Sequence, residues 1–250
     1  MKIDFSNKTA LVTGATRGIG KSVADCLYDA GANLILTGTK AEDIEKLNQE
    51  NIKNGKHNIQ FLQADFSDAA STEIFINKLD DVEQIDICIN NAGINIISDF
   101  TDTNFQDFIK LHDINFNAPF KILKSIGPKM ITNRYGRIVN IASIWSVVTR
   151  HGRAMYTSSK NALVGLTKTL AVEWASQNIM VNAVSPGFTL TELTKTTNTA
   201  EQLVAIENMI PAKRMAEPVE MARVIAFLCS DLNTYLTGQN ITIDGGYTIV

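Results

Sequence analysis

The chain has 250 residues, which is enough for one large domain or two small ones. Hydrophobic residues make up 45% of it and charged residues 20%, a balance that excludes a disordered chain, a coiled coil and a collagen-like rod. A formal net charge of -3 without a dense Lys/Arg tract argues against nucleic acid and anionic membranes as partners and favours small solutes.

The N-terminal residues Met1–Lys8 lack the apolar core of a signal peptide, and no run reaches the ~18 apolar residues that a membrane span needs. We therefore expect no membrane segment and a cytoplasmic location. The three cysteines, Cys26, Cys88 and Cys229, lie far apart in apolar segments. This spacing favours small buried side chains over disulfides or metal ligands.

Short apolar segments rich in β-branched residues alternate with longer segments of helical periodicity. This alternation predicts an α/β fold, in which helices cover both faces of a parallel sheet and the strands are apolar throughout. Strands are predicted at Thr9–Val12, Leu34–Leu36, Ile59–Leu62, Ile85–Ile89, Arg137–Ile141, Met180–Val184 and Ile241–Ile243. Helices are predicted at Ile19–Ala30, Glu42–Asn54, Thr72–Leu79, Phe105–Ile131, Met155–Ser176 and Val219–Cys229.

No Pro/Gly/Ser-rich linker, low-complexity tract or internal repeat marks a boundary, so residues 1–250 are predicted to form a single domain. The segment Thr189–Pro211 fits this pattern poorly, because its stretch Thr191–Thr199 is polar and poor in core positions. Its place after a late strand favours a mobile flap over a site at 189–211, and a plain surface loop is the alternative.

The first predicted strand leads into a glycine-rich turn, TGATRGIG at Thr13–Gly20, and then into a helix. Glycines at such a turn let the backbone approach a pyrophosphate, and the free N–H groups of the new helix favour its charge. The spacing is GxxxGxG and differs from the common GxGxxG, so the turn alone is weak evidence.

Three further motifs follow this turn. They are NNAG at Asn90–Gly93 after the fourth strand, Ser143 after the fifth, and the pair Tyr156 and Lys160 in YxxxK. In this order and at these distances the sequence resembles the short-chain dehydrogenase/reductase family, and the resemblance covers essentially the whole chain. It implies a single Rossmann-type domain with a doubly wound parallel sheet of about seven strands and helices on both faces.

The resemblance also implies which residues contact a dinucleotide. Asp65 would bind the adenine amino group, Asn91 and its neighbours would pack along the adenosine ribose, and Pro186–Thr189 would hold the nicotinamide carboxamide. A helix cap is the alternative role for Asp65, and a turn-forming role is the alternative for Asn91. The cofactor positions are Gly14, Thr16, Arg17, Gly18, Ile19, Gly20, Thr39, Lys40, Asp65, Asn91, Ala92, Gly93, Tyr156, Lys160, Pro186, Gly187 and Thr189.

The residues after the second strand bear on the choice of nucleotide. An acidic residue there would bind the ribose hydroxyls of NAD and repel a 2′-phosphate. The chain instead has Thr39, a hydrogen-bond donor, and Lys40, with Arg17 as a further cation. This predicts that NADP(H) is preferred over NAD(H); the alternative is that both cations are merely solvated.

Tyr156 and Lys160 are four residues apart on a predicted helix, so both side chains lie on one face. Lowering a tyrosine pKa from about 10 to about 7 requires ~4 kcal/mol, whereas an exposed ion pair supplies only ~0–1 kcal/mol. We therefore expect Lys160 in a partly desolvated site.

The resemblance assigns four catalytic residues. Tyr156 would donate a proton to a carbonyl oxygen as hydride leaves the nicotinamide, while Ser143 holds that oxygen. Asn115, within the predicted long helix, would hold a water that relays protons to Lys160. Each residue also has an ordinary structural alternative, such as a cap or a helix-surface position.

Within the family, the sequence is most similar to 3-oxoacyl-acyl-carrier-protein reductases. This implies reduction of a 3-oxoacyl thioester, a place in fatty acid biosynthesis, and acyl carrier protein as a candidate partner. That group presents basic residues on two helices near the site entrance. Arg134 keeps one of these, whereas Gln177 replaces the second, so the docking patch is incomplete.

A second departure concerns Trp145, Arg150 and Arg153, which occupy a loop that is typically small and glycine-rich. The guanidinium fork suits a carboxylate or phosphate, so the arginines favour a small anionic keto acid or sugar acid. The alternative is that Arg150 and Arg153 face solvent or a neighbouring subunit.

The three histidines are not assigned to the chemistry. His151 is expected at the surface, because Tyr156 already fills the proton-transfer role. His57 and His112 lie in polar surroundings without partners at metal-ligand spacing, so no metal is expected.

The family commonly assembles as a tetramer, and the composition of two helices agrees with a homotetramer, although a dimer is the alternative. A function of another class is a non-catalytic NADP-binding sensor, which would need the glycine-rich turn but not the proton chain. The apolar positions offered for assembly are Phe116, Phe120, Ile122, Leu163, Leu166, Leu170 and Trp174.

Overall fold

A computed structural model describes residues 2–250 and shows a seven-stranded parallel sheet with the order β3-β2-β1-β4-β5-β6-β7. The predicted doubly wound Rossmann-type sheet is confirmed. The strands are β1 (Thr9–Val12), β2 (Asn33–Gly38), β3 (Ile59–Gln63), β4 (Ile87–Asn90), β5 (Gly136–Ile141), β6 (Ile179–Pro186) and β7 (Asn240–Ile243).

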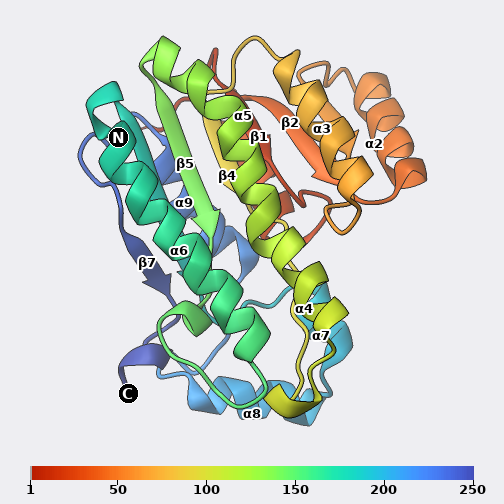
Figure 1. Cartoon of the computed structure of the whole chain (residues 1–250), viewed down its shortest axis with the longest axis vertical. Coiled ribbons are helices and arrows are strands. Elements are labelled where there is room, and N and C mark those ends of the chain that lie inside the picture. The colour runs from red at the N-terminus through yellow and green to blue at the C-terminus, as the bar shows by residue number, and fades with distance from the viewer. Residues whose placement is uncertain (1) are drawn as a thin grey trace.

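Helices cover both faces of this sheet (Figure 1). One face packs against α1, α2 and α9, and the other against α3, α5 and α6. The helices are α1 (Gly18–Asp29), α2 (Ala41–Lys53), α3 (Ala69–Asp80), α4 (Phe105–His112), α5 (Ala118–Asn133), α6 (Ala154–Trp174), α7 (Glu192–Thr197), α8 (Ala200–Met209) and α9 (Pro218–Cys229).

The central strands are buried along their whole length, because helices cover them on both sides. The two edge strands differ from the expectation of fully apolar, fully covered strands. Only Phe61 of the five residues of β3 is buried, and all four residues of β7 are only partly buried. An edge strand has one unpaired side, so its burial depends on what covers that side.

The predicted long helix Phe105–Ile131 is interrupted. The chain follows α4 only to His112, forms a π-helical turn at Asp113–Asn117, and continues as α5. A π turn inserts one extra residue per turn and reorients the side chains there. The periodicity of the sequence does not reveal this insertion, because apolar residues continue on both sides of it.

The segment Thr189–Pro211, read as a flap or loop without regular structure, contains the helices α7 and α8. Thr199 and Gln202 form a capping box at the start of α8, in which each side chain bonds to the other's backbone N–H. This Thr-x-x-Gln pattern was the signal that would have predicted the helix.

Two of the three cysteines, Cys88 and Cys229, are fully buried, as predicted, and burial raises the pKa of both thiols. Cys26 on α1 is partly exposed, which the sequence reading did not anticipate. All three are free thiols. Within the described residues, no helix is both long enough and apolar enough to cross a membrane.

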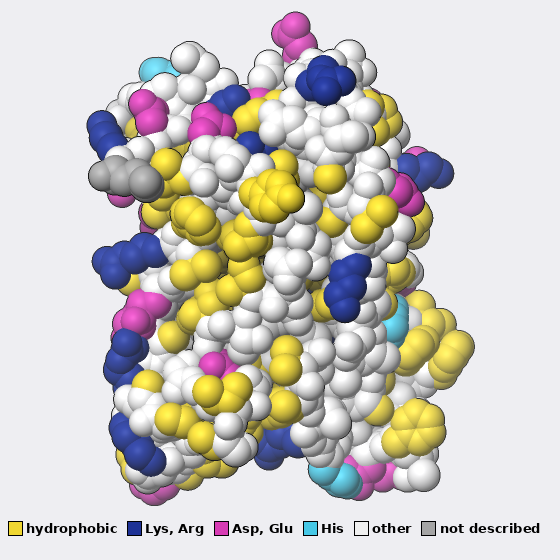
Figure 2. Space-filling model, turned by 90° about the vertical axis from the view of Figure 1, so that its left-hand side faces the viewer, with side chains coloured by type: hydrophobic (Ala, Val, Ile, Leu, Met, Phe, Trp, Pro, Cys, Tyr) yellow, Lys and Arg dark blue, Asp and Glu magenta, His cyan; other side chains and the backbone are white. Residues whose placement is uncertain are grey.

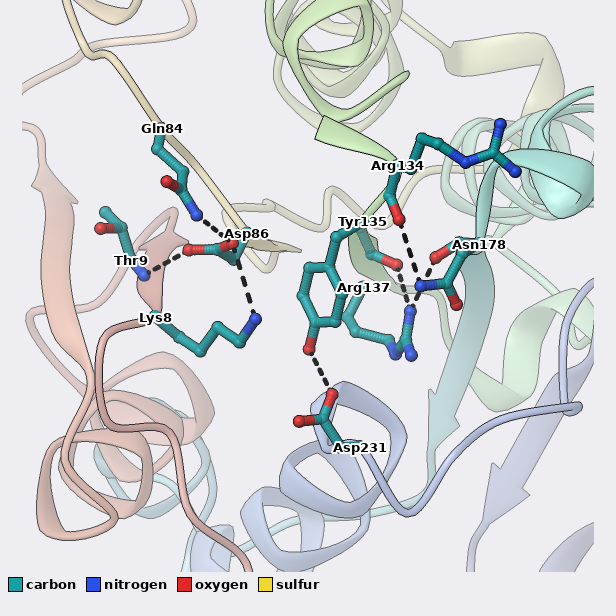
Figure 3. A network of polar contacts seen from close by, with 10 residues as sticks. Lys8, Thr9, Gln84, Asp86, Arg134, Tyr135, Arg137, Asn178 and Asp231 are labelled. Atoms are coloured by element: carbon teal, nitrogen blue, oxygen red, sulfur yellow. Dashed lines mark hydrogen bonds and ion pairs between the residues drawn. The ribbon is translucent and has the colours of Figure 1, made fainter. Parts of the chain in front are cut away.

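A polar network joins the amino ends of the strands, at the edge of the sheet where β1, β4, β5 and β6 begin (Figure 3). The buried Asp86 carboxylate accepts hydrogen bonds from the Thr9 amide and the Gln84 side chain, at 2.9 and 2.6 Å. The buried Arg137 guanidinium donates to the carbonyls of Gly136 and Asn178, both at 2.9 Å. These bonds hold the strand starts in register.

Candidate active site

A cleft of about 450 Å³ opens at the carboxyl ends of β1, β2, β3 and β4. The connection after β1 leads to β2 on one side of β1, and the connection after β3 leads to β4 on the other side. The chain therefore reverses its direction across the sheet between β1 and β4. Such a reversal leaves a crevice, and it is where ligands bind in open α/β sheets. Predicted cofactor residues that line the cleft are Gly14, Thr16, Arg17, Gly18, Ile19, Thr39, Lys40, Asp65, Asn91, Ala92 and Gly93.

The glycine-rich turn has the backbone shape that a phosphate cradle requires. Gly14 and Gly18 adopt φ values of 65° and 58°, a region that favours glycine. A Cβ on Gly20 would lie 2.3 Å from the Gly14 carbonyl oxygen, so no other residue fits there. The N–H groups of the first turn of α1 lack helical acceptors, and Arg17 provides no side-chain cap. The turn therefore fits a bound pyrophosphate.

Asn91 locks this turn to the end of β4. Its side-chain amide donates to the carbonyls of Thr13 and Gly14, at 2.9 and 3.0 Å. The Thr13 hydroxyl in turn accepts the amides of Asn91 and Ala92, both at 3.0 Å. The Asn91 amide group thus organises the turn, and this turn-forming role accompanies its place in the lining of the cleft.

Asp65 follows β3 and lines the cleft. Its Oδ1 accepts the amide and the hydroxyl of Ser67, at 2.9 and 2.7 Å. This is an Asx turn, and the cap of α3 is Asp68. The expected alternative of a helix cap is therefore wrong for Asp65.

The β2–α2 junction closes one end of the cleft. Thr39 and Lys40 are both exposed there, next to Gly38, where a Cβ would come within 2.6 Å of Thr16. The structure also brings Asp43, in the first turn of α2, into the lining. The sequence reading missed this carboxylate because it considered only the residues next to the strand.

Pro186, Gly187 and Thr189 lie at the carboxyl end of β6, beyond the residues that line the cleft. The chain that follows them returns over the glycine-rich turn: a Cβ on Gly18 would lie 3.4 Å from Thr191. Thr191 and Glu192 therefore join the lining, which the sequence reading did not include.

Tyr156 and Ser143 meet beside this cleft. Ser143 lies two residues after β5, is buried, and accepts the Trp145 amide at 3.2 Å. Burial raises the pKa of Tyr156, while the hydrogen bond from Ser143 and the charge of Arg153 oppose that rise. The hydrogen bond from Ser143 thus favours the phenolate form of Tyr156, the form that a proton transfer from Tyr156 would leave.

Lys160 lies one helical turn after Tyr156, with its Nζ 5.7 Å from the centre of the Tyr156 ring. The ammonium is buried and donates to the Ile141 carbonyl at 2.7 Å. Burial lowers its pKa to about 8. The expectation of a desolvated lysine is met.

Asn115 lies in the π turn and is fully buried. Its side chain accepts the Ile94 amide at 2.9 Å and donates to the Ile94 carbonyl and the Ser159 hydroxyl, at 3.0 and 3.1 Å. A Cβ on Gly93 would lie within 3.4 Å of both Asn115 Oδ1 and Lys160 Nζ. The π turn thus brings Asn115 to the same point as Lys160.

Trp145, Arg150 and Arg153 come together next to Ser143. The two guanidinium groups lie 6.0 and 5.6 Å from the centre of the Trp145 ring. Arg153 is partly buried and Arg150 is exposed. Of the two predicted positions, Arg153 is therefore the less exposed.

His112 and His151 each lie close to neighbouring side chains. The His112 ring lies 4.2 Å from the Phe108 ring, and its Nε2 lies 3.2 Å from the Ser158 hydroxyl. His151 is exposed, as expected, and its Nε2 lies 3.4 Å from Asp99. Among residues 2–250, no three His, Cys, Asp or Glu side chains are grouped to hold a metal ion.

Arg134 and Gln177 do not lie near the site entrance. Arg134 ends α5 and donates to Gln177 and to the Ser176 carbonyl, at 3.4 and 3.3 Å. Both residues precede their strands, so they lie at the amino edge of the sheet, where Figure 3 shows Arg134. Ser143 lies beyond the carboxyl end of β5, a strand of about 20 Å. Within one chain, the expected docking position is therefore wrong.

The chain is similar to known proteins over nearly its whole length. A family model described as enoyl-(acyl carrier protein) reductase matches residues 14–248. The chain is 38% identical to 3-oxoacyl-[acyl-carrier-protein] reductase FabG of Rickettsia bellii, over 99% of this chain and 100% of that protein. It is also 38% identical to oxidoreductase UcpA of Salmonella typhimurium, over 98% of this chain and 96% of that protein.

Solved structures give a similar result. A putative NAD(P)-dependent gluconate 5-dehydrogenase from Beutenbergia cavernae, with bound NADP, superposes with a TM-score of 0.91 at 32% identity, covering 99% of each chain. A gluconate 5-dehydrogenase from Burkholderia cenocepacia, in complex with NADP and tartrate, gives 0.90 at 28% identity, covering 99% of this chain and 97% of that one. The relatives differ in the substrates that their names give.

Proposed function

Because this chain belongs to the short-chain dehydrogenase/reductase family and is an NADP-dependent oxidoreductase, we propose that it reduces a ketone to a secondary alcohol at Tyr156. The observation that carries the proposal is the convergence of four side chains beside the dinucleotide cleft. Tyr156, Ser143, Lys160 and Asn115 come from three separate segments: Ser143 bonds to Tyr156, and the Lys160 Nζ lies 5.7 Å from the centre of the Tyr156 ring.

The roles of these residues follow from their contacts. Tyr156 donates its phenolic proton to the carbonyl oxygen, which forms an O–H bond and leaves a phenolate. Ser143 holds the same oxygen by a hydrogen bond and stabilises the phenolate. The buried Lys160 ammonium adds a positive charge in a site of low polarity, where its electrostatic effect is large. Asn115 and the Ile94 backbone position the relay that returns a proton to Lys160.

The cleft fits a dinucleotide, since Gly14 and Gly18, both at positive φ, and the uncapped start of α1 line it. When bound, NADPH would supply the hydride for the carbonyl carbon. Gly14, Arg17, Gly18 and the first turn of α1 would hold its diphosphate.

NADPH is proposed as the preferred nucleotide. Thr39 and Lys40 lie at the end of the cleft where the adenosine ribose would lie. Both side chains are exposed there and would bind a 2′-phosphate. Asp43 lies in the same lining and would oppose that charge. The nucleotide preference is tested by measuring kcat/KM with NADPH and with NADH. A higher value with NADH would contradict the preference for NADPH.

The first candidate substrate is a 3-oxoacyl thioester, which would place the enzyme in cytoplasmic fatty acid biosynthesis. The support is the 38% identity with 3-oxoacyl-[acyl-carrier-protein] reductase over the full chain. An acyl carrier protein would then be the partner, although the position of Arg134 at the amino edge does not favour docking at this chain's own cleft.

The second candidate is a small anionic keto acid or sugar acid. One observation favours it: Arg150 and Arg153 lie against the same ring, Trp145, beside Ser143. A structural relative named as a gluconate 5-dehydrogenase binds tartrate, a dicarboxylate.

The helical segment α7–α8 is proposed to close over the bound nucleotide as a flap at 189–211. Its beginning already contacts the glycine-rich turn through Thr191. A homotetramer is proposed from the face that includes α6 and β7, where hydrophobic side chains gather in the centre and charged ones lie mostly toward the margins (Figure 2).

The first test is NADPH oxidation with acetoacetyl-CoA beside a panel of keto acids and keto sugars, with Tyr156→Phe as the blank. We expect turnover that falls by about 10²–10⁴-fold in the variant, because the proton donor is lost while the cleft is unchanged. Near-normal reduction by Tyr156→Phe would contradict the catalytic assignment. NADPH binding without turnover of any ketone would favour the sensor instead.

A further inference from the structure

We infer that Arg153, stacked on Trp145, is an oxyanion-binding subsite that holds a carboxylate or phosphate of the substrate beside Tyr156. The inference rests on the proposed ketone reduction and deepens it by naming the charge of the substrate. It is carried by the position of Arg153, by the absence of a partner for its charge, and by the rigid ring beneath it.

The position of Arg153 follows from helix geometry and from the turn after β5. Arg153 directly precedes α6, three residues before Tyr156, so the two side chains project on the same side of the helix start. Its guanidinium lies over Trp145, and the Trp145 amide donates to the Ser143 hydroxyl. The cation therefore lies on the ring of the residue whose amide binds Ser143, and its charge acts on Tyr156.

The charge of Arg153 has no counterion in the fold. Among residues 2–250, no carboxylate forms an ion pair with Arg153 or Arg150, and the buried Nε of Arg153 has no acceptor. Burial and the neighbouring charge of Arg150 both lower the pKa of Arg153, and only the Tyr156 side chain acts in the opposite direction. A partly buried cation beside a like charge is unfavourable unless an anion joins it.

Arg137 shows how this fold treats an arginine with a structural role. Its Nε also lacks an acceptor, but its terminal nitrogen donates to two backbone carbonyls at 2.9 Å and ties β5 to β6. The Arg153 guanidinium makes no such bond to the described chain, so its donors are left for a ligand.

The ring beneath Arg153 is fixed by two other aromatic residues. Trp145 meets Phe188 and Tyr247 edge to face, with ring centres 6.3 and 6.2 Å apart, and those two rings lie 5.2 Å from each other. Trp145 is itself nearly inaccessible. A platform held in this way limits the motion of the guanidinium stacked on it, which favours a defined anion position.

Two sources can provide the oxyanion: the carboxylate of a small keto acid, or the phosphates of a pantetheine-linked thioester. Matched substrates separate them. Acetoacetate is compared with its neutral methyl ester, and acetoacetyl-CoA with the phosphate-free thioester of N-acetylcysteamine. Each pair presents a similar ketone with and without the anion.

We expect Arg153→Gln to lower kcat/KM about ten- to a hundredfold more for the anionic member of one pair than for its neutral member, because any effect of the Arg153 charge on Tyr156 is common to both members. Loss confined to acetoacetate assigns the subsite to a carboxylate, and loss confined to acetoacetyl-CoA assigns it to a phosphate. Arg153→Lys should restore part of the loss, and the exposed Arg223→Gln on α9 is the matched control. An equal effect on all four substrates, or none, would overturn the inference while the ketone reduction stands.

A second readout does not depend on turnover. Malonate added to the enzyme saturated with NADP should quench the Trp145 fluorescence of the wild-type enzyme and not that of Arg153→Gln. The only other tryptophan is Trp174. It lies at the end of α6 and packs on Gly127 in α5. If malonate does not bind to the wild-type enzyme and all four substrates respond equally, the subsite is excluded even where the reductase activity is confirmed.

Discussion

Lys160 shows the conflict between stability and chemistry at a single residue. Its ammonium is buried and has one hydrogen bond, to the Ile141 carbonyl. Burial lowers its pKa from 10.5 to about 8, so the folded chain holds this proton less tightly than the unfolded chain does. The folded protein therefore bears a cost at neutral pH for keeping a positive charge near Tyr156.

Replacement of Lys160 by Met should stabilise the protein and abolish the activity. The charge cost is about 3 kcal/mol, and loss of the hydrogen bond to Ile141 offsets about 1 kcal/mol of it, so the gain is about 2 kcal/mol at pH 7. Between pH 8 and 10.5 the unfolded chain binds a proton that the folded chain does not, so this residue makes the wild-type free energy of unfolding rise with pH.

The measurement is urea denaturation of both proteins from pH 7 to 10. The difference between variant and wild type should be largest below pH 8 and should shrink as the pH rises. A variant that is less stable at pH 7, or a difference that does not depend on pH, would show that the Lys160 ammonium is compensated by its surroundings.

The glycine-rich turn illustrates how one element depends on another far away in sequence. Gly20, in the first turn of α1, lies against the Gly14 carbonyl and the Asn91 side chain, at distances that exclude a Cβ. Asn91 belongs to the end of β4, so the turn after β1 is built by two strands together. The same holds for Asn115, which the π turn and the Ile94 backbone position jointly.

Substitution of Gly20 by Ala should therefore disrupt the turn. We expect overpacking to cost about 1–3 kcal/mol of the free energy of unfolding, and NADPH affinity to fall steeply, because the turn and Asn91 must shift. Gly165→Ala is the matched control: Gly165 is exposed within α6 and a Cβ there has no neighbour within 4 Å. That change should stabilise by about 1 kcal/mol.

Both variants are measured by urea denaturation and by NADPH fluorescence titration. Unchanged NADPH affinity in Gly20→Ala would contradict this prediction, because it would mean that the turn accommodates a Cβ despite the short distances to Gly14 and Asn91.

At the scale of the whole molecule, the apolar residues that the sequence offered for assembly do not form one exposed stripe. Ile122 and Leu163 are buried in this chain, and Trp174 packs on Gly127. Phe120 stays 47% exposed, and Val172, which the sequence reading did not select, is 84% exposed on α6. The half-buried edge strand β7 lies toward the same side of the molecule (Figures 1 and 2).

The proposed homotetramer predicts a solution mass near four times 27.4 kDa. Val172→Lys should lower that mass, because a charge buried at an interface without a partner is costly. Ile52→Lys is the control, since Ile52 is 63% exposed on α2, away from α6 and β7. Light scattering after gel filtration gives the mass. A wild-type mass near 27 kDa, or equal masses for both variants, would contradict assembly through α6.

The sequence by itself determined the class of fold and most of the cleft, because both depend on local signals. Apolar runs and helical periodicity identified all seven strands, and the glycine-rich turn, NNAG, Ser143 and YxxxK identified residues that the structure brings to one edge of the sheet. Even the missed helix α8 had a local signal in its capping box.

Only the tertiary structure decided the features that arise from contacts between distant segments. The π turn at Asn115, the entry of Asp43 and Thr191 into the cleft, and the place of Arg134 at the far edge depend on packing across the sheet. The same is true of Arg153, whose charge is significant because no carboxylate of the described chain comes near it. Periodicity and motifs report local preference, whereas the partner of a charge is set by long-range packing, which no local pattern encodes.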